Sequence, residues 1–269
     1  MRALALLLAL SASPAATLLA QRPDSLAEEV RKYVSVDTAA VALTHVLLID
    51  GTGSAPKADQ TVLVQNGRIA QVGPAAQVRV PAGALTMDLN GHTLIPGLIG
   101  LHDHLFYTAA GGRAAQMSYT GPRLYLASGV TTIRTAGGRA PYAEINLREN
   151  INKGLVPGPR IHLTAPYITG APGGGSMDVV TSPEEARRFV AYWASEGATW
   201  IKAYTDIRRS ELGAAIKEAH RRGVKVTGHL CSVSFKEAVE LGIDNLEHGM
   251  LTASDFDPSK QPDVCPVSV

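Results

Sequence analysis

The feature that most constrains the fold is an order of elements that repeats after Pro96. An apolar stretch that suits a strand is followed by a turn and then by a longer helical stretch. Strands that alternate with helices are typical of a parallel sheet, because a parallel connection needs a long crossover. The six candidate strands are 94–102, 130–135, 160–165, 200–204, 225–229 and 245–248. The sequence therefore predicts an α/β fold with parallel strands.

Helix boundaries in this region are marked by residue type. The clearest predicted helices are 183–196, 210–222 and 234–241. Ser182 followed by Glu185 is a capping-box pattern, and Ser210 stands where a second helix cap is expected. A glycine, which tolerates the left-handed conformation of a helix end, follows each helix, at Gly197, Gly223 and Gly242.

Six strand–helix units correspond to the front three-quarters of an eight-stranded barrel. We therefore predict an incomplete TIM (βα)8-type barrel over residues 94–250, followed by a loop-like tail over 251–269. No candidate for the two closing strands follows, so we expect the sequence to be C-terminally truncated.

The region before the barrel has a different pattern. Residues 41–93 consist of short alternating runs separated by turn residues, with Asn66-Gly67 as the strongest hairpin signal and Asn90-Gly91 as another turn. These features predict a small antiparallel, β-sandwich-like domain. Residues 21–40 are expected to form a linker or short helix.

The first twenty residues have the pattern of a secretory signal peptide. Arg2 is followed by an apolar run over 3–10 and then by small residues up to Ala20. The alternative is a membrane anchor, but the apolar run is too short to span a bilayer and Pro14 lies soon after it. We therefore expect a secreted or periplasmic protein, with no stable membrane insertion after cleavage.

Composition narrows the class of partner. The chain has 25 Lys and Arg against 24 Asp and Glu, and no basic stripe that would favour nucleic acid. A small-molecule substrate is the expected partner, and a homo-oligomer is compatible with the sequence. Export permits disulfides, but the spacing of Cys231 and Cys265 leaves their pairing open.

Histidines and one lysine stand where the predicted strands end. His102 and His104 are two positions apart, so both side chains leave the same face of the first strand. Lys202, His229 and His248 occupy the same level of the fourth, fifth and sixth strands. In a barrel this level is the active-site face, and imidazole is a common metal ligand. Hydrogen-bonded core histidines are the alternative, but several at one level favour a metal site.

Lys202 lies in an apolar strand, where an unpaired ammonium group would be costly. Carboxylation by carbon dioxide would convert the amine into a carbamate that can bridge two cations. A partner carboxylate at the barrel mouth is the alternative, and the residues alone favour neither.

Several motifs together resemble the amidohydrolase superfamily. They are the run Leu94-Ile95-Pro96-Gly97-Leu98-Ile99 before His102-Asp103-His104, then Gly228-His229, and Glu247-His248-Gly249. The resemblance covers residues 41–250. Trp200-Ile201-Lys202 and the run 218–223 are similar to the imidazolonepropionase-like and prolidase-like branch.

The resemblance implies a site with two divalent metals, usually zinc. His102 and His104 would bind the more buried metal and His229 and His248 the more exposed one, with carboxylated Lys202 between them. It also implies hydrolysis of C–N bonds in amides, cyclic amides or dipeptides by a metal-activated hydroxide.

The family also uses an aspartate after the eighth strand as ligand and base, and this chain ends before such a strand. The catalytic residue is therefore unassigned, and the chain by itself is expected to be inactive. Tyr204 is a candidate substrate contact. Two alternatives are a one-metal amidohydrolase or deaminase, with Lys202 as a charge partner only, and a non-catalytic periplasmic binding protein.

Overall fold

The computed structural model describes residues 25–108, 113–175 and 177–267, so the predicted signal peptide lies outside the described residues. The chain divides into two compact units. The first covers Val34–Pro96, and the second covers Gly97–Val269 together with Leu26–Tyr33. In the described ranges, no helix has both the length and the apolar character needed to cross a membrane.

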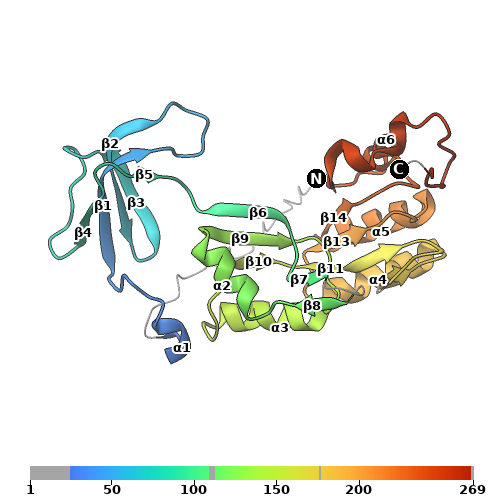
Figure 1. Cartoon of the computed structure of the whole chain (residues 1–269), viewed down its shortest axis with the longest axis horizontal. Helices are drawn as coiled ribbons and strands as arrows, with labels where there is room; N and C mark the ends of the chain where they lie inside the picture. Colours follow the sequence, from blue (N-terminus) through green and yellow to red (C-terminus); the bar gives the residue numbers. More distant parts are fainter. Residues whose placement is uncertain (1–24, 109–112, 176, 268–269) are drawn as a thin grey trace, which may run out of the picture. The chain divides into compact units, whose positions relative to one another are not determined.

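The first unit is one mixed sheet of five strands around β1 (Figure 1). The strands are β1 (Ala40–Leu48), β2 (Lys57–Gln65), β3 (Arg68–Pro74), β4 (Leu85–Asp88) and β5 (Thr93–Leu94). The pairs β1–β2 and β2–β3 are antiparallel, whereas β4 and β5 pair with β1 in parallel. The predicted antiparallel pairing is therefore present among β1, β2 and β3 and not at β4 and β5. The predicted β-sandwich is not confirmed, because these strands form one sheet.

The turns of this unit follow its residue types. Asn66 and Gly67 both have positive φ, 49° and 71°, and join Gln65 to Arg68 across the β2–β3 hairpin, as predicted. At the second predicted turn, the Leu89 carbonyl accepts a hydrogen bond from His92 N at 2.9 Å. That turn connects two strands that both pair with β1, so it does not close a hairpin.

The second unit contains parallel strands in the predicted order. One sheet has the order β10-β9-β6 and the other β12-β11-β13-β14-β15 (Figure 1). Their bounds are β6 (Leu98–Asp103), β9 (Val130–Thr135), β10 (Arg160–His162), β11 (Thr164–Thr169), β12 (Asp178–Val179), β13 (Trp200–Ala203), β14 (Lys225–Gly228) and β15 (Asn245–Leu246). All their pairings are parallel, which confirms the α/β class.

Two predicted strands are divided. The stretch 94–102 splits into β5 and β6 around Pro96, which has no N–H to donate to a ladder. The stretch 160–165 splits into β10 and β11, where the Leu163 carbonyl accepts from Thr199 N and Trp200 N. At the same point Thr164 N donates to Thr135 Oγ1 at 2.9 Å. This contact joins the two sheets.

The helices alternate with the strands. They are α1 (Glu28–Arg31), α2 (Thr120–Ala127), α3 (Pro141–Asn152), α4 (Pro183–Ser195), α5 (Arg209–Arg221) and α6 (Phe235–Glu240). A short hairpin of β7 (Phe106–Thr108) and β8 (Ala114–Gln116) follows β6. The three predicted helices are present, each with bounds shifted by one residue at one or both ends. The glycines at 197, 223 and 242 have the expected positive φ.

The helix caps differ from the prediction at two places. Ser182 accepts a hydrogen bond from Glu185 N as expected, and the Glu185 carboxylate accepts from Thr181 N. A capping box with both of its hydrogen bonds is found instead at Ser234 and Glu237. Ser210 is not a cap, because α5 begins at Arg209 and the Ser210 hydroxyl donates to Glu211.

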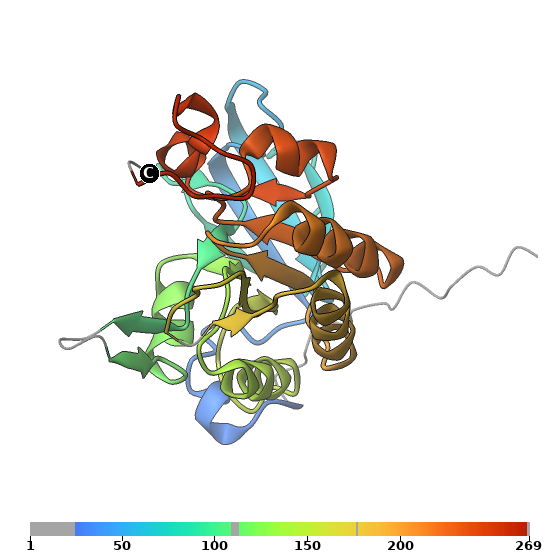
Figure 2. The same ribbon diagram turned by 90° about the vertical axis from the view of Figure 1, so that its right-hand side faces the viewer.

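The main core lies between strands β11, β13 and β14 and helices α4 and α5. Ile201 and Val226 from the strands pack with Val190 from α4 and with Leu212 and Ile216 from α5. Figure 2 shows α4 and α5 side by side along these strands. This packing buries the strand bodies and leaves their C-terminal ends to carry polar residues.

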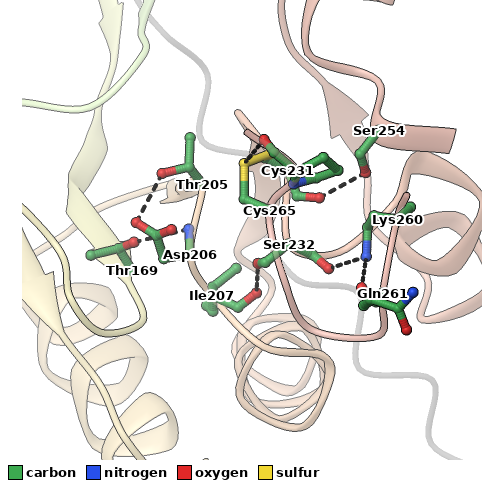
Figure 3. Close-up of a disulfide and its surroundings, with 11 residues drawn as sticks. Thr169, Thr205, Asp206, Ile207, Cys231, Ser232, Ser254, Lys260, Gln261 and Cys265 are labelled. Carbon is green, nitrogen blue, oxygen red and sulfur yellow. Dashed lines mark hydrogen bonds between the residues drawn. A yellow bond between two sulfur atoms is a disulfide. The ribbon is translucent and has the colours of Figure 1, made fainter. Parts of the chain in front are cut away.

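A disulfide between Cys231 and Cys265 settles the pairing that the sequence left open. It ties the tail to the loop after β14 (Figure 3). The Ser254 hydroxyl donates to the Cys231 carbonyl at 2.7 Å, and Lys260 Nζ donates to the Ser232 carbonyl at 2.7 Å. Because these bonds flank the disulfide, the tail is fixed at several points.

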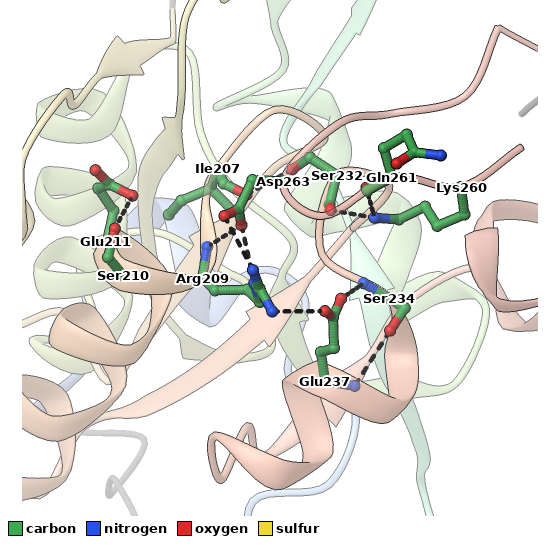
Figure 4. Close-up of polar contacts among 10 residues, drawn as sticks. All are labelled: Ile207, Arg209, Ser210, Glu211, Ser232, Ser234, Glu237, Lys260, Gln261 and Asp263. Carbon is green, nitrogen blue, oxygen red and sulfur yellow. Dashed lines mark hydrogen bonds and ion pairs between the residues drawn. The ribbon is translucent and has the colours of Figure 1, made fainter.

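A second group of polar contacts fixes the tail to α5 and α6 (Figure 4). Arg209 N donates to Asp263 at 2.7 Å, and its guanidinium pairs with Glu237 at 3.2 Å. Asp255 accepts from the N–H groups of Phe235 and Lys236, at the start of α6. The tail is therefore packed on the rest of the second unit; its regular structure within the described residues is a 3-10 turn at its start (Gly249–Thr252) and a second one at Ser254–Phe256.

Candidate functional site

The C-terminal ends of three parallel strands bring four imidazole rings together. His102 belongs to β6, His104 follows it, and His229 and His248 follow β14 and β15. The ring centroids are 5.3 Å apart for His102 and His104, 4.6 Å for His102 and His248, and 4.3 Å for His229 and His248. Residues that are far apart in the sequence thus form one cluster, at the level the sequence predicted.

His248 reaches this cluster through an unusual backbone conformation. Its φ is 64°, in the left-handed region that non-glycine residues rarely adopt. Such a conformation costs about 1–3 kcal/mol and persists where its surroundings enforce it. The turn brings the His248 ring against His102 and His229 directly after β15 ends.

Lys202 lies within β13 and is 1% exposed. The carboxylate paired with it is Glu247, with 3.7 Å between Lys202 Nζ and Glu247 Oε1, and Nζ has no hydrogen-bond partner among the described residues. Burial lowers the pKa of Lys202 to about 8, against the opposing charge of Glu247. The buried amine is thus close to a carboxylate but not satisfied by it.

Glu247 lies at the centre of a group of buried polar residues, with Arg134 and Thr227, that have no predicted role from sequence. Its Oε2 is 2.6 Å from His102 Nδ1, and its Oε1 is 2.9 Å from a guanidinium nitrogen of Arg134. The hydroxyl of Thr227 also donates to Oε1. Burial raises the pKa of Glu247, but Arg134, Lys202, Thr227 and His102 outweigh it and hold the pKa at about 2. Its position directly before His248 was the available signal.

The other imidazoles are held near their neutral form. Burial first, and then the neighbouring His248, lowers the pKa of His229 to about 4. Burial likewise lowers the pKa values of His104 and His248, with the charge of Lys202 acting in the same direction. A neutral imidazole keeps a nitrogen lone pair available near pH 7, as metal binding requires.

Aromatic side chains line one side of the cluster. The Tyr204 ring lies 4.5 Å from His229 and 5.3 Å from the Tyr167 ring. Tyr167 is buried and also faces His104, at 6.5 Å between centroids. Tyr204 therefore lies beside the predicted site, although its contact with a substrate stays a prediction.

The donor set fits divalent metal ions. Four imidazoles suit zinc, and Nζ of Lys202, which has no hydrogen-bond partner among the described residues, is a buried polar atom that a carbamate and its cations would satisfy. In the described part of the chain, however, no group of three or more His, Cys, Asp or Glu side chains is arranged to hold a metal ion as it stands. The five predicted ligands are brought together, and their roles as ligands stay predictions.

Sequence comparison relates this region to hydrolases. Residues 93–254 match the amidohydrolase family. An 83-residue stretch is 35% identical to the dihydroorotase of Mycobacterium tuberculosis. The stretch covers 31% of this chain and 18% of that enzyme. The same values hold for the dihydroorotase of Mycobacterium bovis.

Solved structures show the same relationship at the level of the fold. A prolidase candidate from Bifidobacterium longum superposes with a TM-score of 0.66 and 31% identity, over 78% of this chain and 54% of its own. A Xaa-Pro dipeptidase with bound methionine gives a TM-score of 0.67 and 21% identity, over 78% of this chain and 61% of its own. The chain thus spans little more than half the length of these proteins. With the family match covering more than half of its residues, the chain belongs to the amidohydrolase family.

Proposed function

We propose that this chain carries the metal-binding part of a hydrolase that cleaves C–N bonds in amides, cyclic amides or dipeptides. The observation that carries the proposal is the cluster of four imidazoles, at the ends of β6, β14 and β15, beside a buried lysine of β13 whose Nζ has no hydrogen-bond partner among the described residues. The 31% identity with a prolidase candidate and the match to dihydroorotase support this class of bond, because both names denote enzymes that act on C–N bonds.

Two divalent cations, most simply zinc, would be shared among these residues. His102 and His104 would hold one, His229 and His248 the other, and a carboxylated Lys202 would lie between them. Glu247 is a poor partner for a protonated Lys202, because its nearer oxygen already forms an ion pair with Arg134 and accepts a hydrogen bond from Thr227. A neutral amine can combine with carbon dioxide, and burial increases the neutral fraction of Lys202 by lowering its pKa to about 8.

Bound cations would supply an activated water near neutral pH and would polarise the scissile carbonyl. The protein contributes the geometry. Neutral imidazoles at fixed strand ends present their lone pairs, and Arg134 with Glu247 fixes the buried side of the cluster. The ring of Tyr204, next to His229, is positioned to contact a substrate that approaches the cluster.

The parallel strands also support the predicted incomplete barrel. Within the described residues β6 pairs with β9 alone, and its apolar side chains are exposed: Leu98 by 49%, Ile99 by 63% and Leu101 by 67%. Exposed apolar residues along a free strand edge favour pairing with further strands. We propose that two more strand–helix units close the barrel in a longer protein and supply the missing aspartate.

Hydrolysis assays test this function. The full product of the reading frame that contains this chain would be loaded with zinc and bicarbonate and given Xaa-Pro dipeptides, N-acyl amino acids and cyclic amides. We expect turnover that a chelator abolishes and that Lys202→Ala abolishes, whereas Lys217→Ala, an exposed lysine on α5, retains it. Turnover that survives both the chelator and Lys202→Ala would contradict the proposal.

A one-metal hydrolase or deaminase is the second candidate. The ion pair between Lys202 and Glu247 favours it, because a lysine that serves as a charge partner needs no carbon dioxide. The number of zinc ions per chain separates the two candidates, as does the effect of bicarbonate on binding.

Export is the remaining part of the proposal. The pattern of residues 1–20 supports a secreted or periplasmic protein. Sequencing the N-terminus of the protein recovered from the periplasm or medium tests it, with Gln21 as the expected first residue. Retention of Met1 in a cytoplasmic product would contradict it.

A further inference from the structure

We propose that Glu247 is a positioning residue that keeps the proton of the His102 ring on Nδ1 and so leaves Nε2 free to bind a cation. This inference deepens the proposed function and rests on it for the identity of the ligand. The position of the His102 proton can be measured on metal-free protein.

The contact between the two side chains defines the direction of the hydrogen bond. Glu247 Oε2 lies 2.6 Å from His102 Nδ1, and Glu247 is 4% exposed. An ionised carboxylate can only accept hydrogen bonds, so the shared proton must come from Nδ1. A neutral imidazole has one N–H, and Nε2 then keeps its lone pair.

The other carboxylate oxygen, Oε1, has one ion pair and one hydrogen bond. A guanidinium nitrogen of Arg134 lies 2.9 Å from Oε1, and the Thr227 hydroxyl also donates to it. Thr227 Oγ1 itself accepts from Asn245 Nδ2 at 2.9 Å, which leaves the hydroxyl hydrogen for Glu247. These contacts keep Oε2 directed at His102.

Arg134 is itself fixed. It is 6% exposed, and its guanidinium carbon lies 4.7 Å from the centroid of the Trp200 ring. Burial and the contact with Trp200 hold this guanidinium beside Oε1. The orientation of the Glu247 carboxylate is therefore set by β9, β13 and β14, and not by His102 alone.

His104 shows the same arrangement with a different acceptor. Its Nδ1 lies 3.1 Å from the Gly137 carbonyl, which can only accept. Both histidines of the pair thus have a pure acceptor at Nδ1, so both would present Nε2. A metal-binding histidine is commonly oriented in this way by a carboxylate or carbonyl on its other nitrogen.

The structure predicts what an amide would do in place of the carboxylate. In Glu247→Gln the amide oxygen would occupy the Oε1 position, because the Thr227 hydroxyl donates to that position and the Arg134 guanidinium lies 2.9 Å from it. The amide NH2 would then face His102 Nδ1 and donate to it. The His102 proton would move to Nε2, the atom that a cation needs.

Nitrogen NMR of histidine-labelled, metal-free protein tests this directly, at about pH 8.5, where imidazole is normally neutral. We expect His102, assigned with a His102→Gln variant, to carry its proton on Nδ1 in the wild type and on Nε2 in Glu247→Gln. Glu184→Gln, which changes an exposed carboxylate on α4, should leave the wild-type spectrum unchanged. A wild-type His102 with its proton on Nε2 only, or with protons on both nitrogens, would overturn the proposal. This result would count even if the variant failed to fold.

Zinc titration supplies the second readout. We expect Glu247→Gln to weaken zinc binding by about 10–100-fold and Glu184→Gln to leave it unchanged. Equal zinc affinity in wild type and Glu247→Gln would overturn the inference. Absence of zinc binding in the wild type would instead contradict the proposed function, while the NMR result would still decide the position of the proton.

Discussion

Glu144 offers the clearest test of the electrostatics of this fold. It lies in the first turn of α3 and is fully buried, and neither carboxylate oxygen has a hydrogen-bond partner among the described residues. Its carboxyl group lies directly against Gly138, where an added Cβ would be 2.9 Å from both oxygens. Burial raises the pKa of Glu144 from 4.5 to about 8, against a smaller opposing contribution from Gln116.

The direction of the effect follows from proton binding. The unfolded chain loses this proton near pH 4.5, and the folded chain keeps it up to about pH 8. Between these values the folded state binds more protons, so the stabilising contribution is complete below pH 4.5 and is lost as the pH rises through 8. At about 1.4 kcal/mol per pKa unit, the interval from 4.5 to about 8 corresponds to about 5 kcal/mol.

Urea unfolding of wild type and Glu144→Gln at a series of pH values measures this contribution. The amide does not titrate, so the variant should gain stability relative to wild type by about 4 kcal/mol between about pH 5 and pH 9. Glu184→Gln, on the surface of α4, should show no such trend. A difference between wild type and Glu144→Gln that stays constant with pH would refute the reasoning, because a buried ionised carboxylate would then cost nothing.

Three further changes have defined outcomes. The disulfide closes a loop of 34 residues, so the double variant Cys231→Ser and Cys265→Ser should have an unfolding free energy about 4 kcal/mol lower than wild type. Reductant should lower the stability of the wild type and leave that of the double variant unchanged. A wild type whose urea midpoint does not change with reductant would contradict this prediction. Ser234→Ala removes the hydroxyl of a capping box and should lower the unfolding free energy by about 1 kcal/mol, whereas an unchanged urea midpoint would be the contrary result. Gly137 has a φ of 101°, and an added Cβ would lie 2.6 Å from the Tyr167 ring. Gly137→Ala should therefore lower the unfolding free energy by about 1–3 kcal/mol. A thermal midpoint equal to that of the wild type would exclude this strain.

The sequence predicted the parts of the fold that local signals determine. Strand β9 was predicted with its observed bounds from the alternation of strand-like and helical stretches, and most of its residues are β-branched. The level of the site also followed from sequence, because parallel strands end at one edge. His229 and His248 were expected there from strand position alone and are found 4.3 Å apart.

Other features depend on distances that a sequence does not contain. Glu247 and His102 are separated by 145 residues, and the role of the carboxylate becomes visible only when four strands converge on it. The pairing of Cys231 with Cys265 likewise required the path of the tail. Ser210 failed as a cap because α5 starts earlier and the hydroxyl of Ser210 donates to the neighbouring Glu211.

The most direct test of the central claim is the zinc content of the purified chain. The protein would be equilibrated with zinc and bicarbonate, freed of loosely bound ions by gel filtration, and analysed for metal per chain. We expect two equivalents of zinc per chain for wild type and a loss of bound zinc in Lys202→Ala, with Lys217→Ala unchanged. A folded wild-type chain that retains no zinc would contradict the claim that these strand ends form a metal site.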